Sequence, residues 1–186
     1  MSYPELYVLR HGETEWNVTG KFQGRQDSPL TAQGRQHAQR QRELLQTLTT
    51  PPLTAFCSPQ GRARHTAQLA LGGTLKPVFD DRLQEIDFGV WEGKTRLEIK
   101  TLIDCPFESH QWYFQSPKGE SYADISKRVK AFLNDLVQPA VIVTHGVTSI
   151  VLRGLYLGLS KGALLQLPKE QGCIYHLSDG QERVLR

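Results

Sequence analysis

Two His-Gly pairs, at residues 11–12 and 145–146, each follow a short apolar run, and Arg10 stands directly before the first pair. A neutral imidazole can attack phosphorus, and a guanidinium offers phosphate oxygens a planar fork of N–H donors. An arginine beside a histidine at the end of an apolar run therefore predicts a site that binds and attacks a phosphoryl group. The second pair ends another such run and offers a second imidazole to the same site.

A second arginine follows a third apolar run. Residues 54–57 form this run, Ser58 comes next, and Arg62 lies at the start of the following helical segment. Ligands of open α/β sheets bind beyond the carboxyl ends of the strands, so we expect these three strand ends to converge. The groups expected to meet there are Arg10, His11, Ser58, Arg62, Thr144 and His145. Two imidazoles and two guanidiniums around one small volume suit a dianionic phosphoryl group.

The elements that position these groups alternate along the chain between apolar runs and segments with helical periodicity. Strands are expected at 6–9, 54–57, 77–79 and 139–144, and helices at 32–48, 62–71, 95–102, 122–136 and 147–157. Thr31 and Ser121 stand at helix N-cap positions. Segments 173–177 and 182–185 predict a terminal hairpin. This order predicts an α/β fold: a three-layer α/β/α sandwich with a mostly parallel central sheet and a C-terminal β-hairpin, in one domain over residues 1–186.

Periodicity weakens between residues 80 and 119, which we interpret as a covering segment. Its aromatic side chains belong either to the core or to the wall of a pocket; they are Phe107, Trp112, Tyr113 and Phe114. We expect the part from 94 to 118 to determine substrate specificity.

Composition narrows the classes of function. The chain has 186 residues, with 22 Lys and Arg against 19 Asp and Glu, and a net charge of +3 is too mild and dispersed to predict nucleic-acid binding. No segment approaches the length of a membrane helix, and the start shows no export signal, so a cytoplasmic protein is expected. The three cysteines lack any Cys-x-x-Cys spacing and are expected to be reduced and structural. The oligomeric state is left open.

Several blocks together resemble a known family. Leu-Arg-His-Gly-Glu-Thr-Glu-Trp-Asn at 9–17 and Phe-Gln-Gly-x-x-Asp-Ser-Pro-Leu-Thr at 22–31 resemble the histidine phosphatase superfamily, the phosphoglycerate-mutase-like proteins. The similarity continues, in order, through blocks at 58–67, 83–93, 119–121 and 144–146. The resemblance thus covers most of the chain.

The resemblance implies a role for each residue around the first motif. His11 would be the nucleophile that forms a phosphohistidine. Arg10 and Arg62 would clamp the phosphoryl oxygens, His145 would donate to the same group, and Gly146 would belong to the binding site. Because arginines and histidines supply the positive charge, no metal and no cofactor is implied.

Glu85 matches the general acid/base of the family, which protonates the leaving alkoxide and later takes a proton from water. The other carboxylates nearby are better interpreted as structural or solvated; they are Asp80, Asp81, Asp87 and Glu92. The resemblance also places Asn17, Gln23 and Gly24 in the loop that lines the phosphate pocket. The remaining histidines are expected to be structural or on the surface: His37, His65, His110 and His176.

The motifs leave more than one function open. Phosphatases and mutases share the first step and differ in the acceptor of the phosphoryl group. A hydrolase acting on a small phosphorylated metabolite is favoured, because the segment 94–118 is short and Val147 stands where the glycolytic mutases of the family carry an asparagine. The blocks resemble the branch that holds α-ribazole phosphatase and broad-specificity phosphomonoesterases. A non-catalytic module that binds a phosphorylated ligand is the alternative from another class, and the physiological substrate is not indicated.

Overall fold

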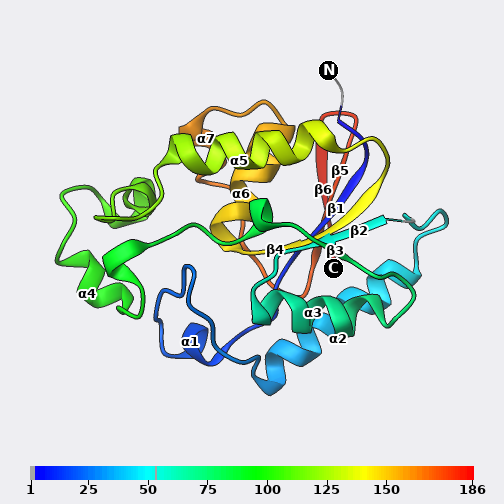
Figure 1. The fold of residues 1–186 in the computed structure, drawn as a ribbon, viewed down its shortest axis with the longest axis horizontal. Coiled ribbons are helices and arrows are strands. Elements are labelled where there is room, and N and C mark those ends of the chain that lie inside the picture. Colours follow the sequence, from blue (N-terminus) through cyan, green and yellow to red (C-terminus); the bar gives the residue numbers. More distant parts are fainter. Residues whose placement is uncertain (1–2, 53) are drawn as a thin grey trace.

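A twisted sheet forms the centre of the protein in a computed structural model that describes residues 3–52 and 54–186 (Figure 1). Its strands are β1 (Leu6–Arg10), β2 (Thr54–Cys57), β3 (Val78–Phe79), β4 (Ala140–Thr144), β5 (Ile174–Ser178) and β6 (Gln181–Leu185), and they lie in the order β3-β2-β4-β1-β5-β6. The pairs β2–β3, β2–β4 and β1–β4 are parallel, whereas β5 is antiparallel to both β1 and β6. The predicted mostly parallel sheet with a terminal hairpin is confirmed.

Helices occupy the expected places, with small shifts at their ends. The helices are α1 (Glu15–Val18), α2 (Ala32–Gln46), α3 (Gly61–Leu71), α4 (Arg96–Lys100), α5 (Tyr122–Asp135), α6 (Gly146–Tyr156) and α7 (Lys161–Leu164). The sequence prediction missed α1 and α7, because a single helical turn carries too little periodicity to detect. Within the described residues, no helix is both long and apolar enough to span a membrane.

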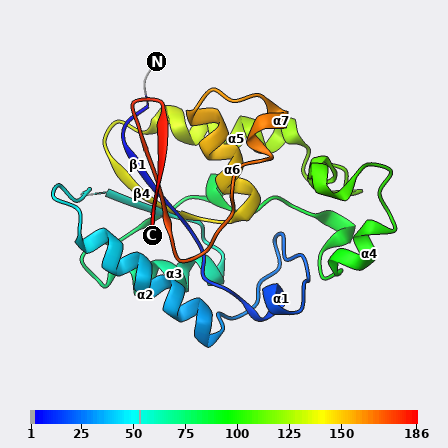
Figure 2. The same cartoon turned by 180° about the vertical axis from the view of Figure 1, so that it is seen from behind.

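The alternation of side chains along the strands explains the three layers. Leu6 and Val8 of β1 join the core under α5 and α6, whereas Tyr7 and Leu9 face the core formed with α3. Figures 1 and 2 show α5, α6 and α7 on one side of the sheet and α2 and α3 on the other. Both faces of the central strands are therefore covered, which is why their sequences are continuous apolar runs.

Side-chain caps set the starts of two long helices. The Thr31 hydroxyl accepts from Gly34 N at 2.9 Å, and Ser121 forms a capping box with Asp124. These bonds satisfy backbone donors that the first turn of a helix leaves free. Both predicted N-caps are confirmed.

The segment from 80 to 119 folds over the end of the sheet as short turns. Its 3-10 helices are η1 (Asp81–Leu83), η2 (Gly89–Trp91), η3 (Phe107–Ser109) and η4 (Gln111–Phe114). Trp112 is only 1% exposed, stacks on Phe107 at 4.6 Å between ring centroids and meets Phe22 edge-on. Aromatic contacts thus extend the core into this segment, while Tyr113 reaches the functional cavity described below.

One buried ion pair fastens the terminal hairpin to α6. The fully buried Arg153 guanidinium donates from Nε to Glu182 Oε2 at 2.6 Å and from Nη2 to Oε1 at 2.7 Å. Its Nη1 donates to Pro168 O at 2.7 Å, and the group lies 3.6 Å from the ring centroid of Tyr175. Arg153 therefore holds both β6 and the segment before β5 in place.

Replacing Glu182 by alanine should destabilise the fold strongly, because the Arg153 guanidinium stays buried without its carboxylate. We expect the free energy of unfolding to fall by about 3 kcal/mol, as measured by urea denaturation. Glu170→Ala is the matched control, since Glu170 pairs with Arg186 at the surface and its loss should change stability little. Equal decreases in the free energy of unfolding of the two variants would contradict a stabilising role for the buried pair of Arg153 and Glu182.

Candidate active site

Three neighbouring strands end at the same edge of the sheet, and their ends carry the residues singled out in the sequence. His11, which follows β1, donates its backbone N–H to Thr144 O of β4 at 2.9 Å. Ser58, which follows β2, donates its backbone N–H to Val143 O of β4 at 3.0 Å. The predicted convergence of the three strand ends is therefore confirmed.

His11 is buried and held in one tautomer. Its Nδ1 lies 2.8 Å from Gly12 O, which can only accept, so Nδ1 carries the proton and Nε2 keeps its lone pair. Burial, Arg62 and Arg10 together hold the pKa of His11 well below its ordinary value of 6.5. The imidazole is therefore neutral at physiological pH and presents a nucleophilic nitrogen.

Arg62, at the start of α3, is fixed against this nitrogen. Its Nε donates to His11 Nε2 at 3.3 Å, and the guanidinium is buried. Three of the four other N–H donors are taken by Asp27 Oδ1 at 2.8 Å, Gln26 O at 2.7 Å and Gly24 O at 3.0 Å. Burial lowers the pKa of Arg62, and Asp27 opposes this effect. The loop before α2 therefore decides where this guanidinium points.

The backbone conformation at Gly24 favours glycine, and the Glu92 carboxylate fills the space where a side chain would begin. The φ of +52° at Gly24 lies in the left-handed region, and a Cβ would lie 2.0 Å from Glu92 Oε1. That Glu92 carboxylate accepts from Arg25 N at 2.6 Å and so braces the loop instead of facing the cavity. Glu92 is thus structural, as expected from the sequence.

Glu85 is oriented by the first turn of α6. Its Oε1 accepts from Ile86 N and Thr148 N, both at 3.0 Å, while Oε2 accepts from Val147 N at 3.1 Å. Backbone N–H groups at a helix start are well placed to hold an anion. Oε2 therefore carries fewer hydrogen bonds than Oε1 among the described residues, and it is the oxygen better placed to exchange a proton with a ligand.

The remaining carboxylates near Glu85 are engaged elsewhere. Asp80 forms an ion pair with Arg82, and Asp87 accepts from Gly89 N at 2.7 Å. Asp81 accepts from Gln84 Nε2 at 2.6 Å. None of these three carboxylates lines the cavity that contains Glu85.

His145 lies behind His11 and is fully buried. Its Nε2 is 2.7 Å from Ser58 Oγ, a hydroxyl that also accepts from Gln60 N at 3.3 Å. Its Nδ1 has no hydrogen-bond partner among the described residues. Burial, Arg62 and His11 hold the pKa of His145 well below 6.5. His145 is thus a neutral imidazole, and its ring centroid lies 5.2 Å from that of His11.

Arg10 approaches the same volume from β1. One of its Nη atoms donates to Lys169 O, whereas Nε has no partner among the described residues. Gly146 lies between Arg10 and the Glu85 carboxylate. A Cβ at this position would lie 3.5 Å from Arg10 Nε and 3.6 Å from Glu85 Oε2. The glycine thus keeps open the space between these two charged groups.

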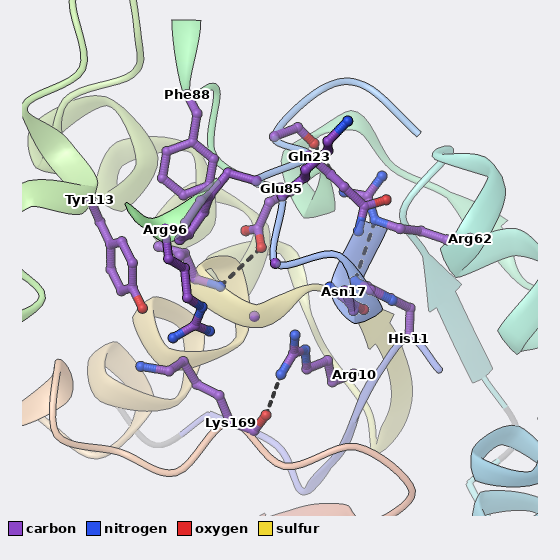
Figure 3. A pocket seen from close by; sticks show the side chains of 16 residues that line it. Arg10, His11, Asn17, Gln23, Arg62, Glu85, Phe88, Arg96, Tyr113 and Lys169 are labelled. Atoms are coloured by element: carbon purple, nitrogen blue, oxygen red, sulfur yellow. Dashed lines mark hydrogen bonds between the residues drawn. The ribbon is translucent and has the colours of Figure 1, made fainter. Parts of the chain in front are cut away.

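A cavity of about 110 Å³ joins these groups (Figure 3). Of the residues predicted from the sequence, its walls contain Arg10, His11, Asn17, Gln23, Gly24, Arg62, Glu85 and Gly146. Asn17 Oδ1 accepts from Thr14 N at 3.1 Å, and Gln23 Nε2 donates to Thr14 Oγ1 at 2.8 Å, so both amides also brace the loop. His145 is not part of the wall.

Sequence reasoning missed several groups of the cavity, among them Arg96 from the segment expected to determine specificity and Lys169 from the loop before β5. Tyr113, which the sequence assigned either to the core or to a pocket wall, lines the cavity. Burial raises the pKa of Tyr113 to about 12, so its hydroxyl stays protonated. No motif marks Lys169, because only the fold brings it to Arg10. The histidines expected to be structural do not line the cavity; they are His37, His65, His110 and His176.

The fold and this cavity define an α/β protein with an anion-binding site at the carboxyl edge of its sheet. The family model of the histidine phosphatase superfamily (branch 1) matches residues 6–185. The chain therefore belongs to this superfamily, whose members include phosphatases and phosphoglycerate mutases, and the resemblance seen in the sequence is confirmed.

Relatives of both kinds are similar to the chain. It is 34% identical to the "Probable phosphoglycerate mutase GpmB" of Citrobacter koseri, over 97% of this chain and 86% of that protein. YhfR of Bacillus stearothermophilus has a solved structure with a TM-score of 0.81 and 34% identity, covering 97% of this chain and 95% of the other. The α-ribazole phosphatase from Shigella flexneri has a TM-score of 0.82 and 29% identity, with the same coverage.

The buried neutral histidines should make stability depend on pH. The unfolded chain protonates them near pH 6.5 and the folded chain does so only at much lower pH, so the free energy of unfolding should fall as pH decreases below 6.5. Each of the two contributes a slope of up to about 1.4 kcal/mol per pH unit. Urea denaturation between pH 7 and pH 5 should show a shallower slope for His11→Gln. The exposed His65→Gln control should retain the wild-type slope, and a wild-type slope in His11→Gln would refute the expectation.

Proposed function

We propose that this protein is a metal-independent phosphomonoesterase that hydrolyses a small phosphorylated metabolite through a phosphohistidine on His11. The observation that carries the proposal is the His11 imidazole, which is neutral, buried and fixed with its Nε2 lone pair beside the Arg62 guanidinium. A fixed nucleophile with charge stabilisation already in place needs little reorganisation to reach the transition state.

In the first step, Nε2 attacks phosphorus and the bond between phosphorus and the ester oxygen breaks. Arg10 and Arg62 neutralise charge on the phosphoryl oxygens. In the tautomer protonated at Nδ1, a nitrogen without a partner among the described residues, His145 donates to one of these oxygens. Protonated Glu85 gives its proton from Oε2 to the leaving alkoxide. The step yields a phosphohistidine, a free alcohol and a Glu85 carboxylate.

In the second step, the Glu85 carboxylate takes a proton from water. The resulting hydroxide attacks phosphorus, and the bond between phosphorus and Nε2 breaks. Inorganic phosphate leaves, the His11 imidazole is neutral again, and Glu85 is protonated for the next cycle. One carboxylate thus serves as acid and then as base, as microscopic reversibility requires.

Water is favoured over a second substrate hydroxyl as the acceptor. The short segment 94–118 contributes only Arg96 and Tyr113 to the cavity wall, and Arg96 is exposed, which leaves the site accessible to water. Mutase-type transfer is the second candidate, and the similarity to proteins named as mutases favours it. Incubation with 3-phosphoglycerate separates the two: hydrolysis releases inorganic phosphate, whereas isomerisation that outpaces phosphate release would overturn the preference for a hydrolase.

Substituting His11 by alanine should abolish hydrolysis of p-nitrophenyl phosphate, because the attacking nitrogen is lost. The wild-type protein should act without added metal and be insensitive to a chelator. The measurement is p-nitrophenolate release, supported by detection of an alkali-stable, acid-labile phosphoenzyme. His65→Ala removes an exposed histidine and should retain wild-type activity. Hydrolysis of p-nitrophenyl phosphate by His11→Ala would show that His11 is not the nucleophile.

Glu85→Gln should discriminate between leaving groups. An alkoxide needs a proton to depart, so we expect kcat/KM for glycerol 3-phosphate to fall by roughly 100-fold or more. The p-nitrophenolate ion departs without a proton, so the loss of kcat/KM on its ester should be much smaller. Initial rates of phosphate release on both esters give this comparison, with the exposed Glu43→Gln as control. An equal decrease in kcat/KM for the two esters would show that Glu85 is not the general acid.

A further inference from the structure

Positive charge in the cavity exceeds what one phosphoryl group needs. The wall contains five cationic side chains, Arg10, Lys21, Arg62, Arg96 and Lys169, but a single carboxylate, Glu85. Arg62 is also paired with Asp27 outside the wall. Even when both carboxylates are counted as ionised, the positive charges exceed the negative ones by three. A phosphomonoester dianion neutralises two of them and leaves at least one.

The surplus lies on one side of the cavity. Figure 3 shows Lys169 and Arg96 pointing toward each other beside Tyr113, across the cavity from His11 and Arg62. The Lys169 ammonium also lies 5.3 Å from the ring centroid of Tyr113. The phosphoryl group attached to His11 would be bound at the opposite side, so these two cations face the rest of the substrate.

Neither of these cations has a carboxylate partner in the part of the chain that the structure describes, although each lies over an aromatic ring, Phe22 for Arg96 and Tyr113 for Lys169. Within residues 3–52 and 54–186, Arg96 and Lys169 form no ion pair with any carboxylate. Lys169 is half-buried, and burial with the neighbouring Arg10 and Arg96 lowers its pKa to about 8. Adjacent cations that lack counter-ions repel each other, and an anion placed between them relieves this repulsion.

The backbone holds Lys169 in this position regardless of its side chain. Lys169 O accepts from Arg10, and the preceding Pro168 O accepts from the buried Arg153 at 2.7 Å. The backbone position from which the Lys169 side chain reaches Arg96 is therefore anchored by the fold.

We propose that Lys169 and Arg96 form a second anion subsite, so that the preferred substrate is a phosphomonoester with a further carboxylate or phosphate a few bonds from the ester. The subsite rests on the proposed function, since the phosphoryl group must lie at His11. This subsite would bind any second anionic group that reaches the Tyr113 side of the cavity. Binding of the phosphoryl group by Arg10 and Arg62 does not by itself require a second anionic group in the substrate.

Matched pairs of substrates test this subsite. 3-Phosphoglycerate and glycerol 3-phosphate differ by a carboxylate in place of a hydroxymethyl group, and fructose 1,6-bisphosphate and fructose 6-phosphate differ by one phosphate. The wild-type kcat/KM for phosphate release should be higher for the doubly anionic member of at least one pair, and that pair identifies the second group. Lys169→Met should reduce this preference roughly tenfold, as expected for the loss of a charge-assisted hydrogen bond.

Two further variants separate a charge effect from a structural one. Lys161→Met removes an exposed lysine that lies over Phe114 and Tyr122, outside the cavity, and should leave the preference unchanged. Lys169→Arg keeps the positive charge and should restore the preference. A loss of preference that arginine does not rescue would contradict the subsite.

The preference should also depend on pH in a defined direction. Lys169 is charged below its pKa of about 8, so the advantage of the doubly anionic substrate should decline as pH rises from 7 to 9. The charged or titratable groups that face Lys169 are Arg10 of β1, Glu85, Arg96 of α4, His110 before η4, Tyr113 of η4 and Arg153 of α6. Lys169→Arg should lose this decline, because arginine stays protonated throughout this range.

The two proposals fail in different ways. Absence of His11-dependent hydrolysis of every ester would reject the proposed function, while calorimetric binding of 3-phosphoglycerate, glycerol 3-phosphate and the two fructose phosphates would still test the subsite. Hydrolysis with equal kcat/KM within both pairs, unchanged in Lys169→Met, would reject the subsite and leave the hydrolase intact. Equal calorimetric affinities within both pairs would reject it as well.

Discussion

The site depends on the contact between the Arg62 guanidinium and His11 Nε2, which links the loop before α2 to the nucleophile. A buried guanidinium is costly unless its donors are satisfied, and here Asp27 and two backbone carbonyls of the loop before α2 accept from it. That loop must therefore be folded before Arg62 can lie against the imidazole. Burial lowers the pKa of His11 most and the Arg62 charge lowers it further, so the residue that positions the nucleophile also helps to keep it neutral.

A second junction, where β4 passes into α6, serves two groups at once. His145 occupies the N-cap position of α6, and the backbone N–H groups of Val147 and Thr148 in the first turn hold the Glu85 carboxylate. Because the imidazole and the carboxylate are fixed by the same turn, their separation is set by backbone geometry. Gly146 between them keeps the turn free of a side chain that would enter the cavity.

Concentrated positive charge is destabilising in the empty site and favourable once an anion binds. Burial lowers the pKa values of Arg10, Arg62 and Lys169, which shows that each would be better solvated elsewhere. Functional sites commonly carry such strain because it strengthens ligand binding. The rest of the fold compensates through well-packed apolar layers and through the buried pair of Arg153 with Glu182.

Local pattern was enough to predict the strands, the long helices and the N-caps at Thr31 and Ser121. It was also enough to place His11 and Arg62 at the same edge of the sheet, since the alternation of strands and helices limits the topology. Short helices such as α1 and α7 escaped detection because their hydrogen bonds extend over a single turn.

The sequence by itself determined the class of fold, the family, and the residues at the strand ends, because these depend on residue type and local periodicity. Only the tertiary structure revealed that Asp27 orients Arg62, that the α6 turn holds Glu85, and that Lys169 lies beside Arg96. Lys169 and Arg10 are 159 positions apart, and their contact arises from the packing of the loop before β5 against the end of β1. Contacts of this kind leave no local signal, since neither residue's neighbours in the chain indicate where the other will lie.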